Sequence, residues 1–248
     1  MDTCPARLSG LGVCENACAT PDAYKLKELI EEETRNTRDG GYLRVINTGT
    51  IGKYLPKWGL RQMVYLGSRY TRPVVRKSSF LQSFPNTYGK KAVKPKLIIK
   101  GLNLLDACLD PDGSTIPGKT TLMITCDQPE GLKLVLGILN SPLAFFYVKQ
   151  KYPASSYNQG TTFTKEMIND LPVPEIATSD RAKLVSLVDR IIAATQRNAG
   201  EEIAALQRDI DRLVYVLYGL TKEEIAIVEG SMSARVASTR FADPAAAK

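Results

Sequence analysis

Short apolar runs dominate the first half of the chain, and helical spacing dominates the second half. Five apolar runs are bounded by Gly, Pro or polar residues and predict strands at 43–46, 63–66, 97–99, 104–109 and 120–125. A polar turn joins the last two runs, which favours a hairpin. Apolar residues three or four apart predict helices over 22–33, 131–139 and 142–152. We interpret the three glutamates at 31–33 as the solvated end of the first helix.

The last third of the chain has the clearest helical periodicity. Leu184, Val188 and Ile191 predict one helix after the extended segment 171–174. A second helix carries a longer apolar row, formed by Ile203, Leu206, Ile210, Leu213 and Leu217. The alternating three and four spacing predicts an antiparallel hairpin with a turn at 198–200. Gly219 ends the second helix, and Thr221-x-x-Glu224 is a capping box that opens a third.

These elements predict the fold class α+β. We expect a mixed β-rich domain with flanking helices over 1–175, where the chain leaves through the extended segment 171–174. A C-terminal antiparallel helical hairpin and a short third helix follow over 176–230. The segment 231–248 is small and polar and is expected to be a flexible tail.

Positive charge is concentrated in one segment, residues 40–100. It contains no Asp or Glu and thirteen basic residues: Arg44, Lys53, Lys57, Arg61, Arg69, Arg72, Arg76, Lys77, Lys90, Lys91, Lys94, Lys96 and Lys100. Eight aromatic residues are interleaved with them: Tyr42, Tyr54, Trp58, Tyr65, Tyr70, Phe80, Phe84 and Tyr88. The formal net charge is +7, so the remainder of the chain is mildly acidic.

An unmixed basic segment with aromatic and amide side chains indicates a polyphosphate partner, because a solvated face usually mixes both signs. The candidate nucleic-acid contacts in it are Arg44, Lys53, Tyr54, Lys57, Trp58, Arg61, Arg69, Tyr70, Arg72, Arg76, Lys77, Lys90 and Lys91. The amide-rich loop 155–162 adds Asn158 and Gln159, which suit either base edges or a solvated surface. A basic surface without a dedicated partner is the alternative interpretation.

Composition excludes several other classes of protein. The sequence has no apolar run of about eighteen residues and no basic-then-apolar leader, so we expect a cytoplasmic protein without a membrane partner. Five cysteines without a secretion signal favour reduced thiols. Cys4, Cys14 and Cys18 could form part of a zinc site, but the chain has no histidine and no fourth ligand nearby. We therefore expect no metal.

Catalytic motifs are mostly absent from the sequence. There is no Gly-rich cofactor turn between a strand and a helix, and no Asn/Asp-Pro-Pro-aromatic tetrapeptide of amino-methyltransferases. Gly113 to Thr120 matches a phosphate loop formally, but a strand-like segment follows it where a helix is needed. A nucleotide hydrolase using this loop is kept as an alternative. The expectation is a chain without catalytic activity or a cofactor of its own.

A series of short motifs resembles a known family. The motifs are Lys94-Pro-Lys-Leu-Ile-Ile-Lys100, Leu139-Asn-Ser-Pro-Leu143, Phe163-Thr-Lys165, Leu171-Pro-Val-Pro174 and Ile210-Asp-Arg-Leu-Val-Tyr-Val-Leu-Tyr-Gly-Leu220. In this order they resemble the TaqI-like C-terminal specificity domain of restriction-modification DNA methyltransferases, including type IIG enzymes. This domain is related to the target-recognition domains of type I specificity subunits. The resemblance covers about residues 40–230.

The resemblance implies sequence-specific recognition of duplex DNA in a restriction-modification or related phage-defence system. S-adenosylmethionine would then bind a partner methyltransferase domain or subunit, because no such domain is visible in this sequence. The helical hairpin would dock that partner, or a second copy, through Leu206, Ile210, Leu213 and Leu217. Two further alternatives are a single-stranded nucleic acid or RNA binder that stacks bases on aromatic residues, and an assembly module with an incidental basic face.

Overall fold

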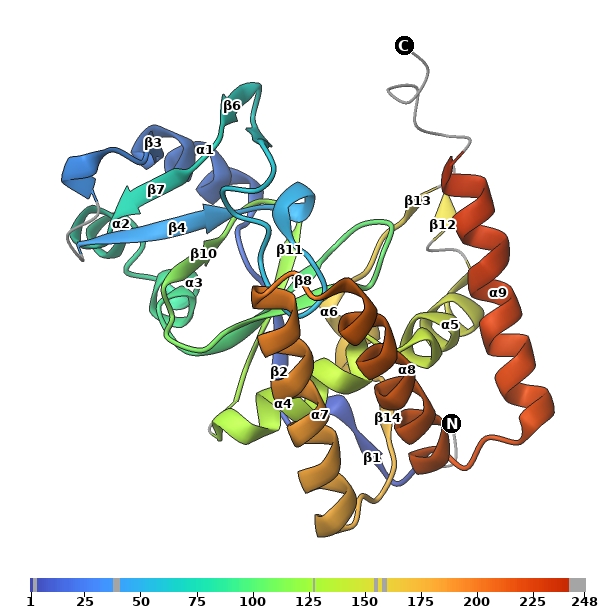
Figure 1. Ribbon diagram of the computed structural model, residues 1–248. Coiled ribbons are helices and arrows are strands. Elements are labelled where there is room, and N and C mark those ends of the chain that lie inside the picture. Colours follow the sequence, from blue (N-terminus) through green and yellow to red (C-terminus); the bar gives the residue numbers. More distant parts are fainter. Residues whose placement is uncertain (2–3, 38–40, 127, 154–155, 158–159, 241–248) are drawn as a thin grey trace.

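The computed structural model describes residues 1, 4–37, 41–126, 128–153, 156–157 and 160–240 (Figure 1). Two lobes lie side by side, each built around a four-stranded sheet, and helices α7 to α9 follow at the C-terminal end. The predicted α+β class is therefore confirmed.

The first lobe contains most of the basic segment. Its sheet has the order β10-β4-β7-β3, formed by Thr115–Pro117, Tyr42–Ile46, Pro73–Arg76 and Glu31–Glu32. Strand β4 runs parallel to β10 and antiparallel to β7. One face of the sheet packs on helices α1 (Thr20–Leu29), α2 (Lys77–Ser83) and α3 (Thr87–Ala92). A small hairpin, β5 (Met63–Tyr65) with β6 (Ser68–Tyr70), extends from it.

The second lobe is built on an antiparallel sheet of order β2-β11-β8-β9. Its strands are Val13–Asn16, Thr121–Thr125, Lys96–Lys100 and Ala107–Asp110. Strand alternation sends Leu122 and Ile124 into the core of this lobe and Met123 into the core of the first lobe. The sheet is thus covered on both faces, which explains its continuous apolar strands.

Helices pack on this second sheet and on one another. They are α4 (Pro129–Leu139), α5 (Pro142–Lys151), α6 (Lys165–Asn169), α7 (Thr178–Gln196), α8 (Gly200–Leu217) and α9 (Lys222–Arg240). The Asn140 amide both donates to and accepts from the backbone of Ala107, which fixes the end of α4 against β9. Ser141 then caps α5 through the Ala144 amide, as predicted. The short strands β1 (Ala6–Arg7) and β14 (Pro172–Val173) pair with each other.

The predicted helical hairpin is confirmed as the packed pair α7 and α8. The capping box also forms, because Thr221 and Glu224 exchange hydrogen bonds of 2.8 and 3.2 Å. Leu184 and Leu206 of this pair belong to the same core as Leu97 and Ile99 of β8. The elements before and after residue 175, the predicted domain boundary, therefore share one core. The predicted domain limits stay a prediction.

Two helices were not predicted, and three local predictions are wrong. Residues 77–92 of the basic segment form α2 and α3, whose Phe80, Phe84 and Tyr88 rings pack in tilted and edge-to-face contacts, with centroids 4.9 to 5.8 Å apart. Helix α1 ends at Leu29. Glu31 and Glu32, which were predicted to belong to this helix, form strand β3 and pair with β7. Strand β8 lies between β9 and β11, so the hairpin expected there does not form. Helix α9 continues to Arg240, well beyond 230, while 241–248 lie outside the described residues.

Among the described helices, none is long and apolar enough by itself to cross a membrane. Helices α4 and α5, bent by 67° at their junction, meet the length and composition criteria only as a pair.

Candidate nucleic-acid interface

The exposed face of the first-lobe sheet carries arginines and aromatic rings. Alternation along β4 buries Leu43 and Val45 and turns Tyr42 and Arg44 outward. Arg76 of β7 lies directly across from Tyr42 in the register. We call the set Tyr42, Arg44, Trp58, Arg72 and Arg76 the arginine–aromatic face.

Trp58 organises the arginine–aromatic face. Its indole Nε1 donates to the carbonyl of Pro73 at 2.8 Å. The guanidinium groups of Arg44 and Arg72 lie over its ring, 5.1 and 4.3 Å from the centroid. Arg76 stacks in the same way on Tyr42 and also donates to its hydroxyl at 2.8 Å. Such stacking holds each planar cation in a restricted orientation.

Arg72 and Arg44 differ in how many of their N–H groups remain free to bind a ligand. Arg72 is paired with Glu33 at 2.5 Å, and its backbone amide is bound by Glu32. Arg44 is exposed and makes no side-chain hydrogen bond or ion pair within the described residues. A stacked guanidinium with free N–H groups can bind a phosphate or the edge of guanine in bidentate fashion.

Residues 53–57, between η3 (Thr48–Thr50) and Trp58, form a second cationic feature that we call the cationic loop. Tyr54 anchors the loop, because its backbone bonds Ala107 and Leu109 on β9 and its side chain is only 2% exposed. Tyr54 adopts a φ of +69°, which turns the chain and leaves Lys53 and Lys57 at the surface. The Tyr54 ring is buried and offers no face for stacking on a base, and its predicted contact with nucleic acid stays a prediction.

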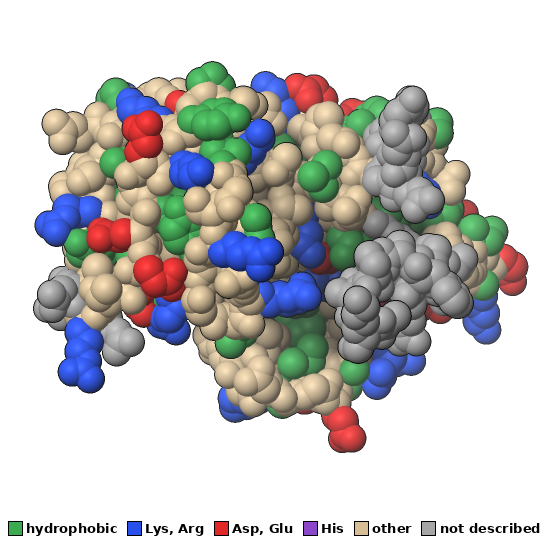
Figure 2. All heavy atoms as spheres, turned by 90° about the horizontal axis from the view of Figure 1, so that it is seen from above, with side chains coloured by type: hydrophobic (Ala, Val, Ile, Leu, Met, Phe, Trp, Pro, Cys, Tyr) green, Lys and Arg blue, Asp and Glu red, His purple; other side chains and the backbone are tan. Residues whose placement is uncertain are grey.

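A cleft of about 530 Å³ separates the cationic loop from the turn between α7 and α8. Lys53, Lys57 and Asp106 line one side, and residues of the α7–α8 turn, including Ile203 and Gln207, line the other. In the view from above, Lys and Arg side chains gather beside a hollow near the middle of the molecule (Figure 2).

The other predicted contacts differ in exposure and in their partners. Exposed positions carry Arg61, Arg69, Lys77 and Lys90, and Tyr70 is half-buried. Lys91 pairs with Glu15 and lines a different cavity of about 510 Å³ with Lys94 and the 9–13 segment. Asn158 and Gln159 lie outside the described residues. The structure therefore joins Arg44, Trp58 and Arg72 in one group and Lys53 and Lys57 in another, and it sets Lys91 apart.

The formal phosphate-loop match is a strand-connecting turn. Asp110 is buried, pairs with the fully buried Lys96, and accepts the backbone amides of Ser114 and Thr115 at 3.1 Å. Gly113 has a φ of +65°, and a Cβ there would lie 2.2 Å from a neighbouring carbonyl oxygen. Strands β10 and β11 follow this turn, so no helix N-terminus faces the loop. Gly113 to Thr120 therefore does not form the strand–loop–helix geometry that the nucleotide-hydrolase alternative requires.

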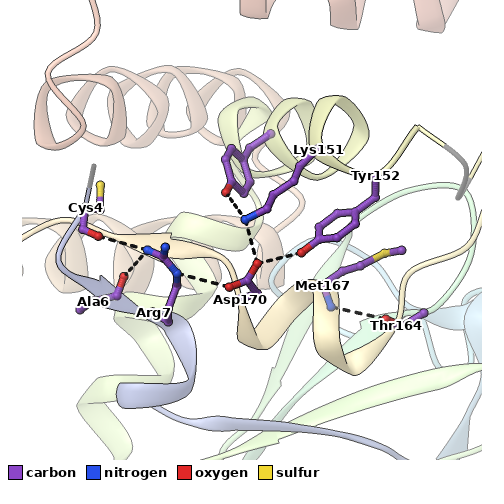
Figure 3. A network of polar contacts seen from close by, with 9 residues as sticks. Cys4, Ala6, Arg7, Lys151, Tyr152, Thr164, Met167 and Asp170 are labelled. Carbon is purple, nitrogen blue, oxygen red and sulfur yellow. Dashed lines mark hydrogen bonds and ion pairs between the residues drawn. The ribbon is translucent and has the colours of Figure 1, made fainter. Parts of the chain in front are cut away.

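Sequence reasoning missed a polar network around Asp170, at the end of α6 (Figure 3). The Asp170 carboxylate accepts from Lys151 and from the Tyr152 hydroxyl, both at 2.8 Å, and pairs with Arg7 at 3.3 Å. Hydrogen bonds from Lys151 and Tyr152 lower the pKa of Asp170. Lys151 also donates to the hydroxyl of Tyr147 at 2.9 Å.

This network anchors a neighbouring segment. Lys151 and Tyr152 stand at the end of α5, directly before the short pair β12 (Ser156–Tyr157) and β13 (Gly160–Thr161). The far side of that pair is bound to the second sheet by Asn103 N–H donating to Thr161 and Phe163 N–H donating to Gly101. The sequence does not predict this cluster, because Arg7, Lys151 and Asp170 come from three separate elements that only the tertiary fold brings together.

The hairpin residues predicted to bind a partner lie in the protein's own core. Leu206, Ile210 and Leu213 are buried, and Leu217 packs against the same core. Leu217 is only partly buried, and the other three have little free surface, so the expectation that these residues dock another chain stays a prediction. The exposed apolar side chains of this region are Val216, 74% exposed, and Ile227, 61% exposed.

The three buried thiols, Cys14, Cys18 and Cys108, do not have a nucleophile's environment. All five cysteines are free, and burial raises the pKa of Cys18 to about 11 and of Cys108 to about 12. Burial also raises the pKa of the Cys14 thiol. Within the described residues, no three His, Cys, Asp or Glu side chains lie together as metal ligands would.

Comparison with known proteins gives a likeness in fold. No protein-family model matches the sequence, and no curated protein does either. Among solved structures, the type IIL restriction-modification enzyme MmeI, determined in complex with DNA, matches 90% of this chain with a TM-score of 0.57 and 11% identity. The type IIG restriction endonuclease BpuSI matches 87% with a TM-score of 0.44 and 10% identity. This chain spans about a third of either enzyme, 35% and 32% respectively, so the likeness is to a part of each.

Proposed function

We propose that this chain is the DNA-reading part of a restriction-modification methyltransferase system and recognises a specific sequence in duplex DNA. In this proposal it is similar to the TaqI-like specificity domains named above and has no catalytic activity of its own. S-adenosylmethionine and the methyl-transfer chemistry belong to a partner domain or subunit. The fold likeness to part of MmeI supports the proposal, because that enzyme was determined in complex with DNA.

The observation that carries the proposal is the arginine–aromatic face with the adjoining cationic loop. Residues 40–100 have no carboxylate, and Arg44, Lys53 and Lys57 are exposed without an ion pair in the described part of the chain. Trp58 directly follows Lys57, so the face and the loop are neighbours along one surface segment. Exposed, unpaired cations of this kind release counterions when they bind phosphates.

The arrangement favours a duplex over a single strand. Base stacking on single strands needs exposed aromatic rings. Five of the eight aromatic residues in the basic segment are buried, namely Tyr54, Tyr65, Phe80, Phe84 and Tyr88. Guanidinium groups already lie over the Trp58 and Tyr42 rings. Stacked arginines suit the phosphates and guanine edges of a major groove better than they suit unstacked bases.

A competition experiment tests the proposal. Fluorescence anisotropy of a labelled duplex library should show binding that falls steeply with salt and competes better with duplex than with single strands of equal length. Arg44→Ala should weaken binding, while Arg190→Ala, which removes an exposed arginine from α7, should not. Equal or better competition by single strands would contradict duplex recognition.

A further inference from the structure

The cleft between the cationic loop and the α7–α8 turn has walls that are fixed in place. Lys53 donates to the carbonyl of Asn140 at 2.8 Å, at the end of α4. That acceptor is neutral, so it does not offset the charge of Lys53, and two further N–H donors remain. Lys57 makes no side-chain bond within the described residues. Asp106, the one carboxylate lining the cleft, is paired with Lys100 at 2.6 Å.

A chain of hydrogen bonds ties the cationic loop to α8. The Tyr54 hydroxyl donates to Gln207 Oε1 at 2.9 Å, and Gln207 Nε2 donates to Asp211 Oδ1 at 2.7 Å. Tyr54 and Gln207 both line the cleft, so this chain passes from one wall to the other. The spacing between the walls is therefore set by specific polar bonds as well as by apolar packing.

We infer that this cleft is a phosphate-binding site for one strand of a nucleic acid, with Lys53 and Lys57 as its cationic side and α8 as the opposing wall. This inference rests on the proposed function and extends it from the cationic loop to α8 as the facing wall of a single site. Two lysines without a carboxylate partner, facing a cleft of about 530 Å³, suit a backbone phosphate. Lysine acts there as a point charge, so the contact carries no sequence preference.

Asp211 is a positioning residue for this cleft and makes it sensitive to protons. Burial raises its pKa to about 6, against opposing contributions from the Gln207 hydrogen bond and the charge of Lys53. The titratable and charged groups that act with it are Lys53 and Tyr54 of the loop, Tyr215 of α8 and Glu229 of α9. At pH 7.5 an ionised Asp211 offsets part of the Lys53 charge. Below about pH 6 that carboxylate is neutral, and the cleft binds phosphate more strongly.

The experiment measures affinity for a labelled duplex as a function of salt. For Lys53→Ala/Lys57→Ala, the slope of log K against log salt should fall in magnitude by about two, one for each phosphate that is no longer neutralised. The reduction in affinity should be equal for all duplex sequences. The matched control, Lys183→Ala/Lys222→Ala, removes two exposed lysines from α7 and α9 and should keep the wild-type slope.

A pH series separates a binding role from a structural one. Wild-type affinity should rise as pH falls from 7.5 to 5.5, and Asp211→Asn should bind more tightly than wild type at pH 7.5 and equally at pH 5.5. A wild-type slope in the double lysine variant, with wild-type protein that does bind duplex, overturns the cleft site. Wild-type protein that binds no duplex overturns the proposed function instead. The same pH dependence in Asp211→Asn as in wild type overturns the role of Asp211.

Discussion

The pH dependence of unfolding tests whether the Asp211 carboxyl is buried as the structure shows. Its pKa is raised from 3.8 to about 6 by burial, so the folded state holds a proton more tightly than the unfolded state. Below about pH 4 the group is protonated in both states and costs nothing. As pH rises from about 4 to about 6 the unfolded state loses this proton before the folded state does, and stability is lost. A difference of about two units corresponds to about 3 kcal/mol above pH 7.

Asp211→Asn removes this cost and keeps an oxygen that can accept from Gln207 Nε2. We expect the variant to gain up to about 3 kcal/mol in the free energy of unfolding at pH 8. The gain should shrink as pH falls and vanish near pH 4. With a urea slope of about 3 kcal/mol/M, the unfolding midpoint at pH 8 should rise by about 1 M. Urea titrations followed by circular dichroism at pH 8, 6 and 4 measure this.

The control is Asp209→Asn, an exposed aspartate on the same helix, which should change stability little at any of these pH values. A variant Asp211→Asn that is no more stable than wild type at pH 8 would refute the reasoning. So would a gain of the same size at pH 4 and pH 8, because that gain could not come from ionisation.

Three further changes follow from the contacts. Gly113→Ala should lower the free energy of unfolding in urea by more than about 1 kcal/mol, because φ is +65° and a Cβ would overlap the Val93 carbonyl. The control Gly10→Ala, where a Cβ meets open space, should not destabilise the protein. Lys96→Met should cost about 3 kcal/mol or more, since it leaves Asp110 buried without its cation, and wild-type stability would contradict this. Arg44→Lys should keep the salt slope of DNA binding but reduce discrimination between duplex sequences, measured on a randomised library; unchanged selectivity would argue against base reading by Arg44.

Local patterns in the sequence predicted the elements that depend on neighbours along the chain. The Ser141 cap, the Thr221 and Glu224 capping box and the α7–α8 pair all form as expected, because their partners lie within a few residues or one turn. Helices α2 and α3 were missed although Phe80, Phe84 and Tyr88 recur every four residues, since Gly and Pro nearby favoured strands.

Features set by tertiary packing could not be predicted in this way. The sequence shows how many cations the basic segment contains. Which of them lie next to each other depends on the pairing of β4 with β7 and on the position of Trp58 over the sheet. The sequence predicted an exposed Tyr54 side chain. In the structure its ring is buried, and its hydroxyl donates to Gln207 of α8. The Asp170 network joins Arg7 to residues more than a hundred positions away, and no local pattern carries that information.

The salt dependence of duplex DNA binding tests the central claim most directly. Wild-type protein should bind a duplex library with log K falling linearly against log salt, with a slope of several units in magnitude. Replacing Arg44, Lys53 and Lys57 together by Ala should reduce that slope by about three and leave the unfolding midpoint within the range of the Lys183→Ala/Lys222→Ala control. A folded triple variant with the wild-type slope would show that DNA does not bind this surface.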